Sequence, residues 1–594
     1  MKKIKLSITT ALLLATNLYS SQDLGTINIS SATKSEQSIK DITSNVEVIT
    51  SYELEEKHIS TVTEALNLIS GVSFTSNGGI GATTSLNLRG MSNKRTLVLI
   101  DGIRFQDPSN TNGANISHLM VSDIEKIEII KGAQSGIWGA DATAGVVNII
   151  TKKAKNGLNG SIFVEGGSFN TKKIGGVVSH KNKNYDIKIS ANQLTTDSFT
   201  VQAPKGEDIK KYEDDSYKNR TINLATSYYI NDNAEINLNI TDIDTQKDYD
   251  SYHNPDDTNM SSDIENRLYN ISFLQKLNNH NIKLKAQQSE FSRDEIGTVA
   301  QWGMQYVKVF EGTTKNIELN DNITYNENDF IVLGVGSSSD DVKYTKTDNS
   351  SEDKKHKDNY IYLTNSNKLN NTILTQSIRY DDYDNFDSKA TGKLGIKHNY
   401  NSYTYVSSNI GTGYTVPNIV EELNPWGAIN SELNPENSKS FDIGFGYKDI
   451  KITYFYNKIE DLIQWYDADG YGGEPAIYKN LDGKSTFKGI EIDYKKDIMQ
   501  DLLLSLNYTN LNAKDKDGED LARRAKEDFK FGIDYYGVEK LHLGLNGQYV
   551  GERYDKANKQ GAQTGKYTIA NFVANYDIKK DLKVYTKVDN ITDK

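Results

Sequence analysis

Cysteine is absent from this chain of 594 residues, and positive charge is in short supply. Without cysteine the chain can form neither a disulfide framework nor a thiolate metal site. The formal net charge is −12, which argues against a nucleic-acid partner because phosphate binding needs clustered Lys and Arg. By length alone the chain holds several ordinary domains or one very large one.

Long apolar runs are also lacking. The N-terminal stretch MKKIKLSITTALLLATNLYSSQ contains lysines, then an apolar run, then small residues, which predicts a secretory signal peptide over residues 1–21. The alternative is a membrane anchor, but the apolar run is shorter than the ~20 residues needed to span a bilayer. No later stretch is apolar enough for a membrane helix, so the mature protein is either soluble beyond the inner membrane or a β-barrel.

Motifs for catalysis and nucleotide binding are missing as well. The segment DGKST (482–486) contains Gly-Lys-Ser, but Tyr478 occupies the position five residues before Gly483 where a phosphate loop needs glycine. The glycines of NGGIG (77–81) lack the strand and helix of a nucleotide fold. No Ser-His-Asp or metal-hydrolase constellation has local support. The sequence therefore predicts no enzyme and no nucleotide cofactor.

Residues 40–152 have the pattern of a compact α+β domain. NVEVIT, LNLRG, RTLVLIDG, IEKIEIIKG and GVVNIITKK each predict a strand. STVTEALNLISG predicts a helix, in which Thr61 and Glu64 fit a capping box and Gly71 is the C-terminal stop. Asp101-Gly102 is a hairpin turn signal, and we assign it no ligand role.

From about residue 158 the pattern changes to alternating polar and apolar residues in segments of roughly ten. In YDIKISANQL, Tyr185, Ile187 and Ile189 point to one side and the polar residues between them to the other; EINLNITDI and LHLGLNGQYV repeat this pattern. A soluble β-sandwich also alternates polar and apolar residues with a period of two, so the period alone does not exclude it. A membrane barrel is favoured by the 36 tyrosines, which suit aromatic girdles, and by a pattern that continues to the end without a helix.

The connections between these segments alternate in length. Short ones lie at 180–184, 230–235, 276–281 and 577–582, and long polar ones at about 195–218, 244–265, 338–358, 414–437 and 460–485. Short turns on one side and long loops on the other are typical of outer-membrane barrels. A closed barrel satisfies every backbone amide where water is absent, which also explains stability without cysteine. We expect 21 strands, one fewer than an even-numbered barrel requires, and no aromatic C-terminus.

Several motifs occur together and in a recognisable order. LNLRG…RTLVLIDGIRF, GIWGADATAGVVNIITKK, the stretch from YTVPNIVEELNP to SKSFDIGF, and KGIEIDY resemble the plug and barrel motifs of the TonB-dependent outer-membrane receptors. The resemblance implies a mainly β fold: an antiparallel transmembrane β-barrel of about 22 strands, the last apparently missing, with an N-terminal α+β plug in its lumen. The expected divisions are a signal peptide (1–21), a TonB-box segment and linker (22–39), a plug (40–152) and a barrel (153–594).

The same resemblance implies a place and a set of partners. The chain would lie in the outer membrane as a monomer, among lipid and lipopolysaccharide. DLGTINISSA (23–32) stands where the family has its TonB box. The TonB box pairs by strand addition with the energy-transducing protein TonB, which is powered from the inner membrane. The alternative is a disordered terminus. The predicted box residues are Leu24, Gly25, Thr26, Ile27, Asn28, Ile29 and Ser30. Arg89 is expected to meet carboxylates of the barrel wall, or else to form an ordinary surface ion pair.

Cobalamin (vitamin B12) is the cargo that the resemblance favours. SNGGIGATTSLNLRG, KDYDSYHNP, LARRAKEDFKFGIDY and GQYVGERYDK are similar to segments of the cobalamin receptors in this family. By position the cargo would contact Ser85, Ser92, Asn110, Thr111, Ser251 and Arg523, with Asn93 as an alternative to Ser92. Ala557-Asn558 departs from an aromatic contact of those receptors. A ferric siderophore receptor or a passive porin are the alternatives. Haem is disfavoured because residues 414–435 contain no histidine.

Calcium is suggested by resemblance and by chemistry. YEDDSY and DYDSYHNPDD crowd carboxylates into two successive long loops, and Ca²⁺ binds several oxygen ligands and offsets their repulsion. The positions expected to ligate the ion are Asp197, Glu213, Asp215, Tyr249 through its backbone, and Asp250, with Asp256 or Asp263 as additions. The alternative is a solvated acidic loop.

Overall fold

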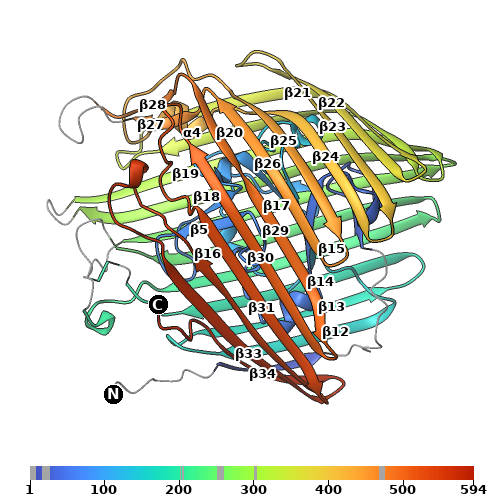
Figure 1. The fold of residues 1–594 in the computed structure, drawn as a ribbon. Coiled ribbons are helices and arrows are strands. Elements are labelled where there is room, and N and C mark those ends of the chain that lie inside the picture. Colours follow the sequence, from blue (N-terminus) through green and yellow to red (C-terminus); the bar gives the residue numbers. More distant parts are fainter. Residues whose placement is uncertain are drawn as a thin grey trace.

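The computed structural model describes residues 9–15, 27–200, 202–203, 207–250, 260–299, 304–466 and 475–594. These residues form a wide closed β-barrel with a smaller α+β domain, the plug, in its lumen (Figure 1). No helix among the described residues is long and apolar enough to cross a membrane.

Within the described part of the chain, residues 157–588 supply 21 strands of the barrel, each antiparallel to its neighbours. The mainly β fold and the expected strand count are therefore confirmed. The strands are β12 (Gly157–Gly166), β13 (Lys172–Lys181), β14 (Tyr185–Thr196), β15 (Tyr217–Asn231), β16 (Ala234–Asp248), β17 (Ser261–Leu277), β18 (His280–Val299), β19 (Met304–Asn326), β20 (Asp329–Thr345), β21 (Ser351–Leu369), β22 (Thr372–Tyr383), β23 (Lys389–Asn401), β24 (Thr404–Thr415), β25 (Glu436–Tyr447), β26 (Ile450–Glu460), β29 (Lys484–Met499), β30 (Leu502–Lys514), β31 (Glu527–Val538), β32 (Leu541–Val550), β33 (Tyr567–Lys579) and β34 (Leu582–Val588).

A further short strand closes the ring. With 21 strands, β12 and β34 run in the same direction, so one more strand antiparallel to both completes an all-antiparallel ring. β1 (Thr9–Ala15) takes this place, with Leu12 opposite Val164 of β12 and Val584 of β34. β1 lies inside the segment predicted to be a signal peptide, and cleavage of residues 1–21 stays a prediction.

The apolar face of the barrel wall points outward, as the sequence predicted. On β14, Ile187 and Ile189 are 37% and 43% exposed, whereas Lys188 and Ser190 on the opposite face are buried. This arrangement is the reverse of a soluble sandwich, whose apolar faces are turned inward. It fits a wall that faces hydrocarbon outside and polar groups inside.

Connection lengths follow the predicted alternation with one correction. The four predicted short connections are turns at 182–184, 232–233, 278–279 and 580–581. The prediction of a long loop over 338–358 is wrong. β20 continues to Thr345 and β21 begins at Ser351, so only five residues lie between the two strands. The polar residues there pair as strands, and at 17 and 19 residues these strands exceed the ~9–11 needed to cross a bilayer.

The plug contains two sheets and three short helices. A five-stranded sheet has the order β4 (Asn45–Thr50), β10 (Ile124–Lys131), β11 (Gly145–Thr151), β8 (Thr96–Ile100) and β9 (Ile103–Arg104), and a three-stranded sheet has the order β5 (Val72–Ser76), β6 (Thr84–Leu88) and β7 (Met91–Ser92). The helices are α1 (Ser51–Glu56), α2 (Val62–Leu66) and α3 (Ser135–Trp138). All five predicted strands of this region are present.

Two local predictions in the plug have different outcomes. Asp101 and Gly102 both have positive φ, +51° and +78°, and turn β8 into β9, so the hairpin signal is confirmed. The helix expected over 60–71 is shorter: α2 ends at Leu66, because the amides of Leu68 and Ile69 bond to carbonyls three residues back instead of four. The Thr61 hydroxyl caps it by accepting a 3.2 Å bond from the Glu64 amide.

The plug core continues into the barrel wall. Leu86, Leu88 and Met91 of the plug belong to the same buried apolar cluster as Phe455 of β26 and Phe487 of β29. Plug and wall are therefore joined by apolar packing on this side, and the polar groups between them are buried without bulk water.

Candidate functional site

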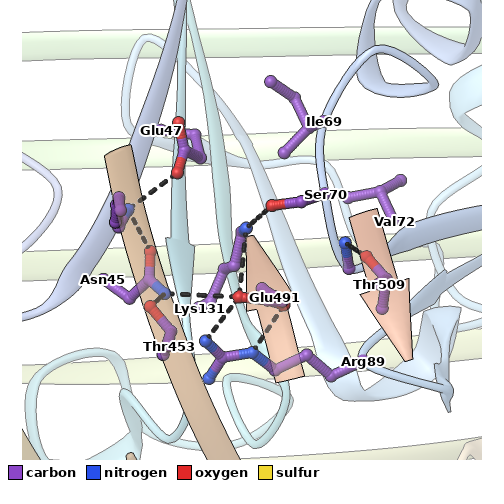
Figure 2. Close-up of polar contacts among 12 residues, drawn as sticks. Asn45, Glu47, Ile69, Ser70, Val72, Arg89, Lys131, Thr453, Glu491 and Thr509 are labelled. Carbon is purple, nitrogen blue, oxygen red and sulfur yellow. Dashed lines mark hydrogen bonds and ion pairs between the residues drawn. The ribbon is translucent and has the colours of Figure 1, made fainter. Parts of the chain in front are cut away.

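Arg89 lies at the centre of a buried ion-pair cluster between plug and wall. Its guanidinium forms two bonds with Glu491 of β29, 3.0 Å from Nε to Oε1 and 2.9 Å from Nη2 to Oε2. Lys131 of the plug is 3.4 Å from the same carboxylate, and Asp442 of β25 is 3.8 Å from Arg89. We call these four residues the lock; Figure 2 shows Arg89, Lys131 and Glu491 of this group. The expectation that Arg89 meets wall carboxylates is confirmed.

Backbone geometry places Arg89 in the lock. Arg89 has φ +51° and Gly90 φ +80°, so the turn after β6 aims the side chain at the wall. Gly71, at φ +70°, fits against the lock so closely that an added Cβ would lie 2.0 Å from Glu491 Oε1. The Gly71 amide donates a 2.8 Å bond to Thr509 of β30. Gly71 is thus required for close approach of plug to wall, a role beyond the helix stop that the sequence predicts.

The polar contacts extend along the plug from the lock. Asn45 donates to Thr453 of β26 and accepts from Lys451, whose ammonium also lies 2.7 Å from Glu47 (Figure 2). Burial alone would raise the pKa of Glu47, but the charges of Lys451 and Lys131 outweigh it and lower the pKa. Both ends of this contact therefore carry charge at neutral pH.

The charges of the lock compensate each other. Burial would lower the pKa of Arg89, but attraction to Glu491 and their hydrogen bonds raise it above the ordinary value. Arg89, Lys131 and Glu491 have no exposed side-chain surface. Removing one partner from such a buried pair costs about 3–5 kcal/mol because the other charge is left without compensation. The lock therefore holds the plug against β25 and β29.

Residues 27–38, which we call the N-terminal arm, are docked on the plug. β2 (Asn28–Ile29) pairs with β3 (Gln37–Ser38), so this segment has the partner strand that the sequence did not reveal. Ile29 is fully buried, and the Ser31 carbonyl accepts a 2.8 Å bond from Trp138. Of the predicted TonB box, Ile27, Asn28, Ile29 and Ser30 belong to the arm, and Leu24, Gly25 and Thr26 lie outside the described residues.

The arm also contacts the barrel wall: Ser35 accepts a 2.7 Å bond from Asn322 of β19, Gln37 donates a 3.2 Å bond to Ser366 of β21, and Lys34 forms an ion pair. Lys34 forms a 2.8 Å ion pair with Glu318 of β19 and lies over the rings of Tyr362 and Trp138, 4.0 and 4.8 Å from their centroids. Lys285 of β18 is also 3.0 Å from Glu318. Burial lowers the pKa of Lys34 to about 7, although the Glu318 charge opposes that shift.

The residues predicted to contact cargo are found at the outer end of the plug and in the outer loops. Ser85, Ser92, Asn110 and Thr111 are partly exposed plug residues, and Arg523 is exposed in the loop between β30 and β31. Ser92 accepts a hydrogen bond from Arg95, and Ser85 is paired with Thr75 across the β5–β6 hairpin. Ser251 lies outside the described residues.

Contacts that sequence reasoning missed hold Asn110 in place. Asn418, the cap of α4 (Ile419–Leu423), donates a 3.0 Å bond to the Asn110 carbonyl. Next to it, Lys94 lies 2.6 Å from Glu421 of α4. Asn418 and Glu421 lie in the motif YTVPNIVEELNP, so a signal was present, but their plug partners are over 300 residues away in the chain.

A basic pocket lies beside Arg523. It lies between the loops before β31 and after β32. Its basic residues are Arg524, Lys526, Arg553, Lys556 and Lys559, and its acidic residues are Asp520 and Glu552. Arg553 reaches the plug by a 3.0 Å bond to the Phe74 carbonyl, and Arg524 by a 3.0 Å bond to the Gly90 carbonyl. The pocket therefore connects the outer loops to the hairpin that carries Ser85.

Three of the predicted calcium ligands come together. Carboxylate oxygens of Glu213, Asp215 and Asp250 lie within 4.8 Å of one another. Burial, a hydrogen bond with Asp250 and repulsion from Asp250 and Asp215 raise the pKa of Glu213 to about 8. Such crowding of carboxylates fits the oxygen-rich coordination that Ca²⁺ prefers.

Of the other predicted ligands on the described residues, the carboxylates of Asp197 and Asp263 are not in this group. The Asp197 carboxylate lies 3.5 Å from the Asn170 amide instead. Tyr249 is adjacent to Asp250, and its amide bonds to the Met260 carbonyl at 3.1 Å. Asp263 is exposed on β17, and Asp256 lies outside the described residues.

Comparison with known proteins identifies both parts of the chain. Residues 160–591 match the family model "TonB dependent receptor-like, beta-barrel", and residues 38–146 match "TonB-dependent Receptor Plug Domain". The chain is similar to "Vitamin B12 transporter BtuB" of Photobacterium profundum, at 28% identity over 100% of this chain and 96% of the relative. It is 25% identical to the protein of the same name from Vibrio vulnificus, over 94% of this chain and 90% of the relative.

Solved structures share the fold at lower identity. The siderophore receptor PirA from Acinetobacter baumannii superimposes with a TM-score of 0.78 at 18% identity, covering 92% of this chain and 94% of its own. A mutant of the ferric enterobactin receptor PfeA from Pseudomonas aeruginosa gives the same TM-score and identity, with 92% and 93% covered. The chain belongs to the TonB-dependent receptors, which are β-barrel proteins of the outer membrane.

Proposed function

We propose that this receptor imports cobalamin through the outer membrane. The observation that carries the proposal is the similarity over nearly the whole chain to several proteins named as vitamin B12 transporters, at 24–28% identity. The partly exposed positions Ser85, Asn110 and Thr111 at the outer end of the plug are where a cargo arriving from outside would first touch it.

The transport step uses the N-terminal arm. Cargo that binds the plug and outer loops shifts the plug toward a state in which the arm is released. The freed residues 23–32 then pair with TonB by strand addition, and TonB pulls with energy from the inner membrane. The plug, held by the buried lock, argues against a passive porin, which has no use for a folded domain in its lumen.

Calcium is part of the proposal. Glu213, Asp215 and Asp250 would hold the ion, and Asp197 and the Tyr249 carbonyl would join them after a loop movement. The bound ion would supply positive charge that offsets carboxylate repulsion and would order the loops after β14 and β16. Ordered loops cost less entropy when cargo binds.

A ferric siderophore is the second candidate cargo. The observation in its favour is the basic pocket beside Arg523, where five Lys and Arg residues face two acidic ones. Ferric chelates that carry net negative charge suit such a pocket. Ala557-Asn558 also stand where the cobalamin receptors have an aromatic contact, and the loss of this contact favours the siderophore alternative.

A binding panel on the purified protein discriminates between these cargoes. Cyanocobalamin, haem and ferric enterobactin are titrated separately into the protein, in the presence and in the absence of Ca²⁺. We expect cyanocobalamin to bind most tightly, and Arg523→Ala and Asn110→Ala to weaken it. Preference for ferric enterobactin would replace cobalamin by a siderophore as the cargo.

Deletion of residues 23–32 tests the transport mechanism separately. We expect surface binding of cyanocobalamin to persist and uptake to be lost, because the segment serves TonB and not cargo. Uptake equal to that of the parent would refute active transport and favour passive diffusion.

A further inference from the structure

One imidazole joins plug and wall at the end of the barrel where the short turns lie. His542, near the start of β32, is buried between the plug helix α1 and strand β31. Its Nδ1 lies 2.8 Å from Glu56 Oε2 of α1, and its Nε2 lies 3.0 Å from Asp534 Oδ1 of β31. A protonated imidazole has an N–H for each of these carboxylates, whereas a neutral ring has a single N–H. Loss of the proton therefore removes the ring as a donor to one of the two carboxylates.

The site also offers a partner for the neutral ring. The side-chain nitrogen of Asn575 on β33 lies 2.8 Å from the same Nδ1. This amide can donate to Nδ1 only when that nitrogen carries no proton, while Glu56 can accept from Nδ1 only when it does. The Asn575 nitrogen also donates a 2.8 Å bond to the Glu56 carbonyl. The protonation state of the ring therefore decides which of two neighbouring groups pairs with Nδ1.

The carboxylates on either side of the ring have further charged partners across the same junction. Lys57 of α1 lies 3.0 Å from Asp534, and Lys583 of β34 lies 3.3 Å from Glu56. Burial would raise the pKa of Glu56, but its hydrogen bond with His542 and the charge of Lys583 lower it. Glu56 is therefore ionised near neutral pH and accepts a hydrogen bond from the ring whenever Nδ1 carries a proton.

A second histidine lies in this cluster but stays neutral. The remaining titratable groups that face the ring or its partners are Tyr52 and His58 of the plug and Tyr536 and Asp577 of the wall. His58 contacts the Asn575 side-chain oxygen, and burial lowers the pKa of His58 well below its usual value although that contact opposes the shift. Imidazole is the side chain that ordinarily changes charge between pH 5 and 8. The change of charge in this cluster near neutral pH therefore falls to His542.

We propose that His542 is a pH-dependent anchor, which holds the plug helix α1 on the barrel wall more firmly in mildly acidic than in mildly alkaline medium. With the ring protonated, Glu56 and Asp534 are joined through one cation. With the ring neutral, Asn575 takes the place of Glu56 at Nδ1, and α1 loses that bond to the wall. α1 follows β4 directly in the chain, and β4 is an edge strand of the plug sheet. The anchor thus sets how firmly this edge of the plug is attached at a given pH.

Hydrogen exchange of the purified full-length protein at pH 6 and pH 8 tests the anchor without cargo or TonB. After correction for the intrinsic pH dependence of exchange, the protection of the α1 amides is compared with that of the β8 amides in the centre of the plug. We expect this ratio to be about tenfold higher at pH 6, the factor that corresponds to one pKa unit of coupling. An equal ratio at both pH values would overturn the proposal.

Two variants assign the effect to the ring. His542→Gln has no titrating ring and is expected to give the same ratio at both pH values. His280→Gln is the matched control, because His280 also lies beside an aspartate, Asp321 at 2.6 Å, but belongs to β18 and has a 41% exposed side chain. We expect His280→Gln to keep the pH dependence of the parent. A His542→Gln protein that keeps it as well would contradict the proposal, and if this variant does not fold, the parent profile still decides.

Discussion

The burial of an ion pair decides how much its residues contribute to the stability of this receptor. Arg220–Asp244 on the barrel is also an ion pair, at 2.9 Å, but its side chains are 51% and 39% exposed. The Arg89–Glu491 pair has the same separation and no exposed surface. Solvent screens the first pair, so it contributes only about 0–1 kcal/mol to stability. Removal of one partner from the second pair is strongly destabilising, because the other charge stays buried without compensation.

Glu491→Gln is expected to lower the stability of the plug by about 3–5 kcal/mol, because Arg89 and Lys131 lose their shared counter-charge. Asp244→Asn, the exposed control, is expected to change it by less than about 1 kcal/mol. Hydrogen exchange of the β4 and β10 amides in increasing denaturant measures both. Equal effects of the two substitutions would show that the lock does not hold the plug.

Calcium affinity is expected to depend on pH through Glu213, if the ion binds as proposed. The raised pKa, about 8, means that the carboxyl is protonated below pH 8 and that Ca²⁺ must displace this proton. Affinity should therefore rise about tenfold per pH unit up to about pH 8 and level off above it. Calorimetric titration at pH 6, 7 and 8 checks this. Glu213→Gln should bind more weakly and lose the slope, and a pH-independent parent would count against the site.

Among the elements, those with a local signal were predictable and those fixed by distant partners were not. The alternation of polar and apolar residues predicted the barrel strands, and the Asp101-Gly102 pair predicted the turn between β8 and β9. The pairing of β2 with β3 was missed, because β2 is held by burial of Ile29 against the plug and not by a local pattern. The strands β20 and β21 extend beyond the membrane, where polar sequence resembles a loop.

The candidate site shows the same division. Arg89 was recognised because the Arg-Gly turn follows a strand, but Lys131, Asp442 and Glu491 are separated from it by tens to hundreds of residues and join it only in the fold. For calcium, the sequence placed the acidic loops correctly. It did not distinguish Asp197, which bonds toward Asn170, from the three carboxylates that meet.

The docking of the N-terminal arm is expected to depend on compensation of the Lys34 charge. Glu318→Gln should speed hydrogen exchange of residues 27–33, because Lys34 stays buried without its carboxylate partner. Adding Lys34→Met should restore slow exchange, since the buried charge is removed and the arm keeps its apolar contacts. If the double variant exchanges as fast as Glu318→Gln, the arm is held by something other than this pair.

At the level of the assembled barrel, the outward apolar face also sets the depth in the membrane. Leu319 and Val307 lie on the same face of β19 and are 46% and 41% exposed. At ~3.3 Å per residue and a tilt of ~45°, Val307 is about 28 Å further along the barrel axis, close to the full thickness of the hydrocarbon. The long strands β18–β21 should therefore carry Val307 above the bilayer while Leu319 lies within it.

Arginine at these two positions gives a matched test of that depth. Leu319→Arg is expected to destabilise the folded barrel in lipid by about 2–4 kcal/mol, and Val307→Arg by about 0–1 kcal/mol. Reversible unfolding in vesicles measures the difference, and in detergent micelles it should shrink because the hydrocarbon layer adapts to the charge. Equal costs in vesicles would mean that the membrane covers β19 up to Val307. The extracellular wall around the basic pocket would then be shorter than the strand lengths indicate, and cargo would meet the plug closer to the bilayer surface.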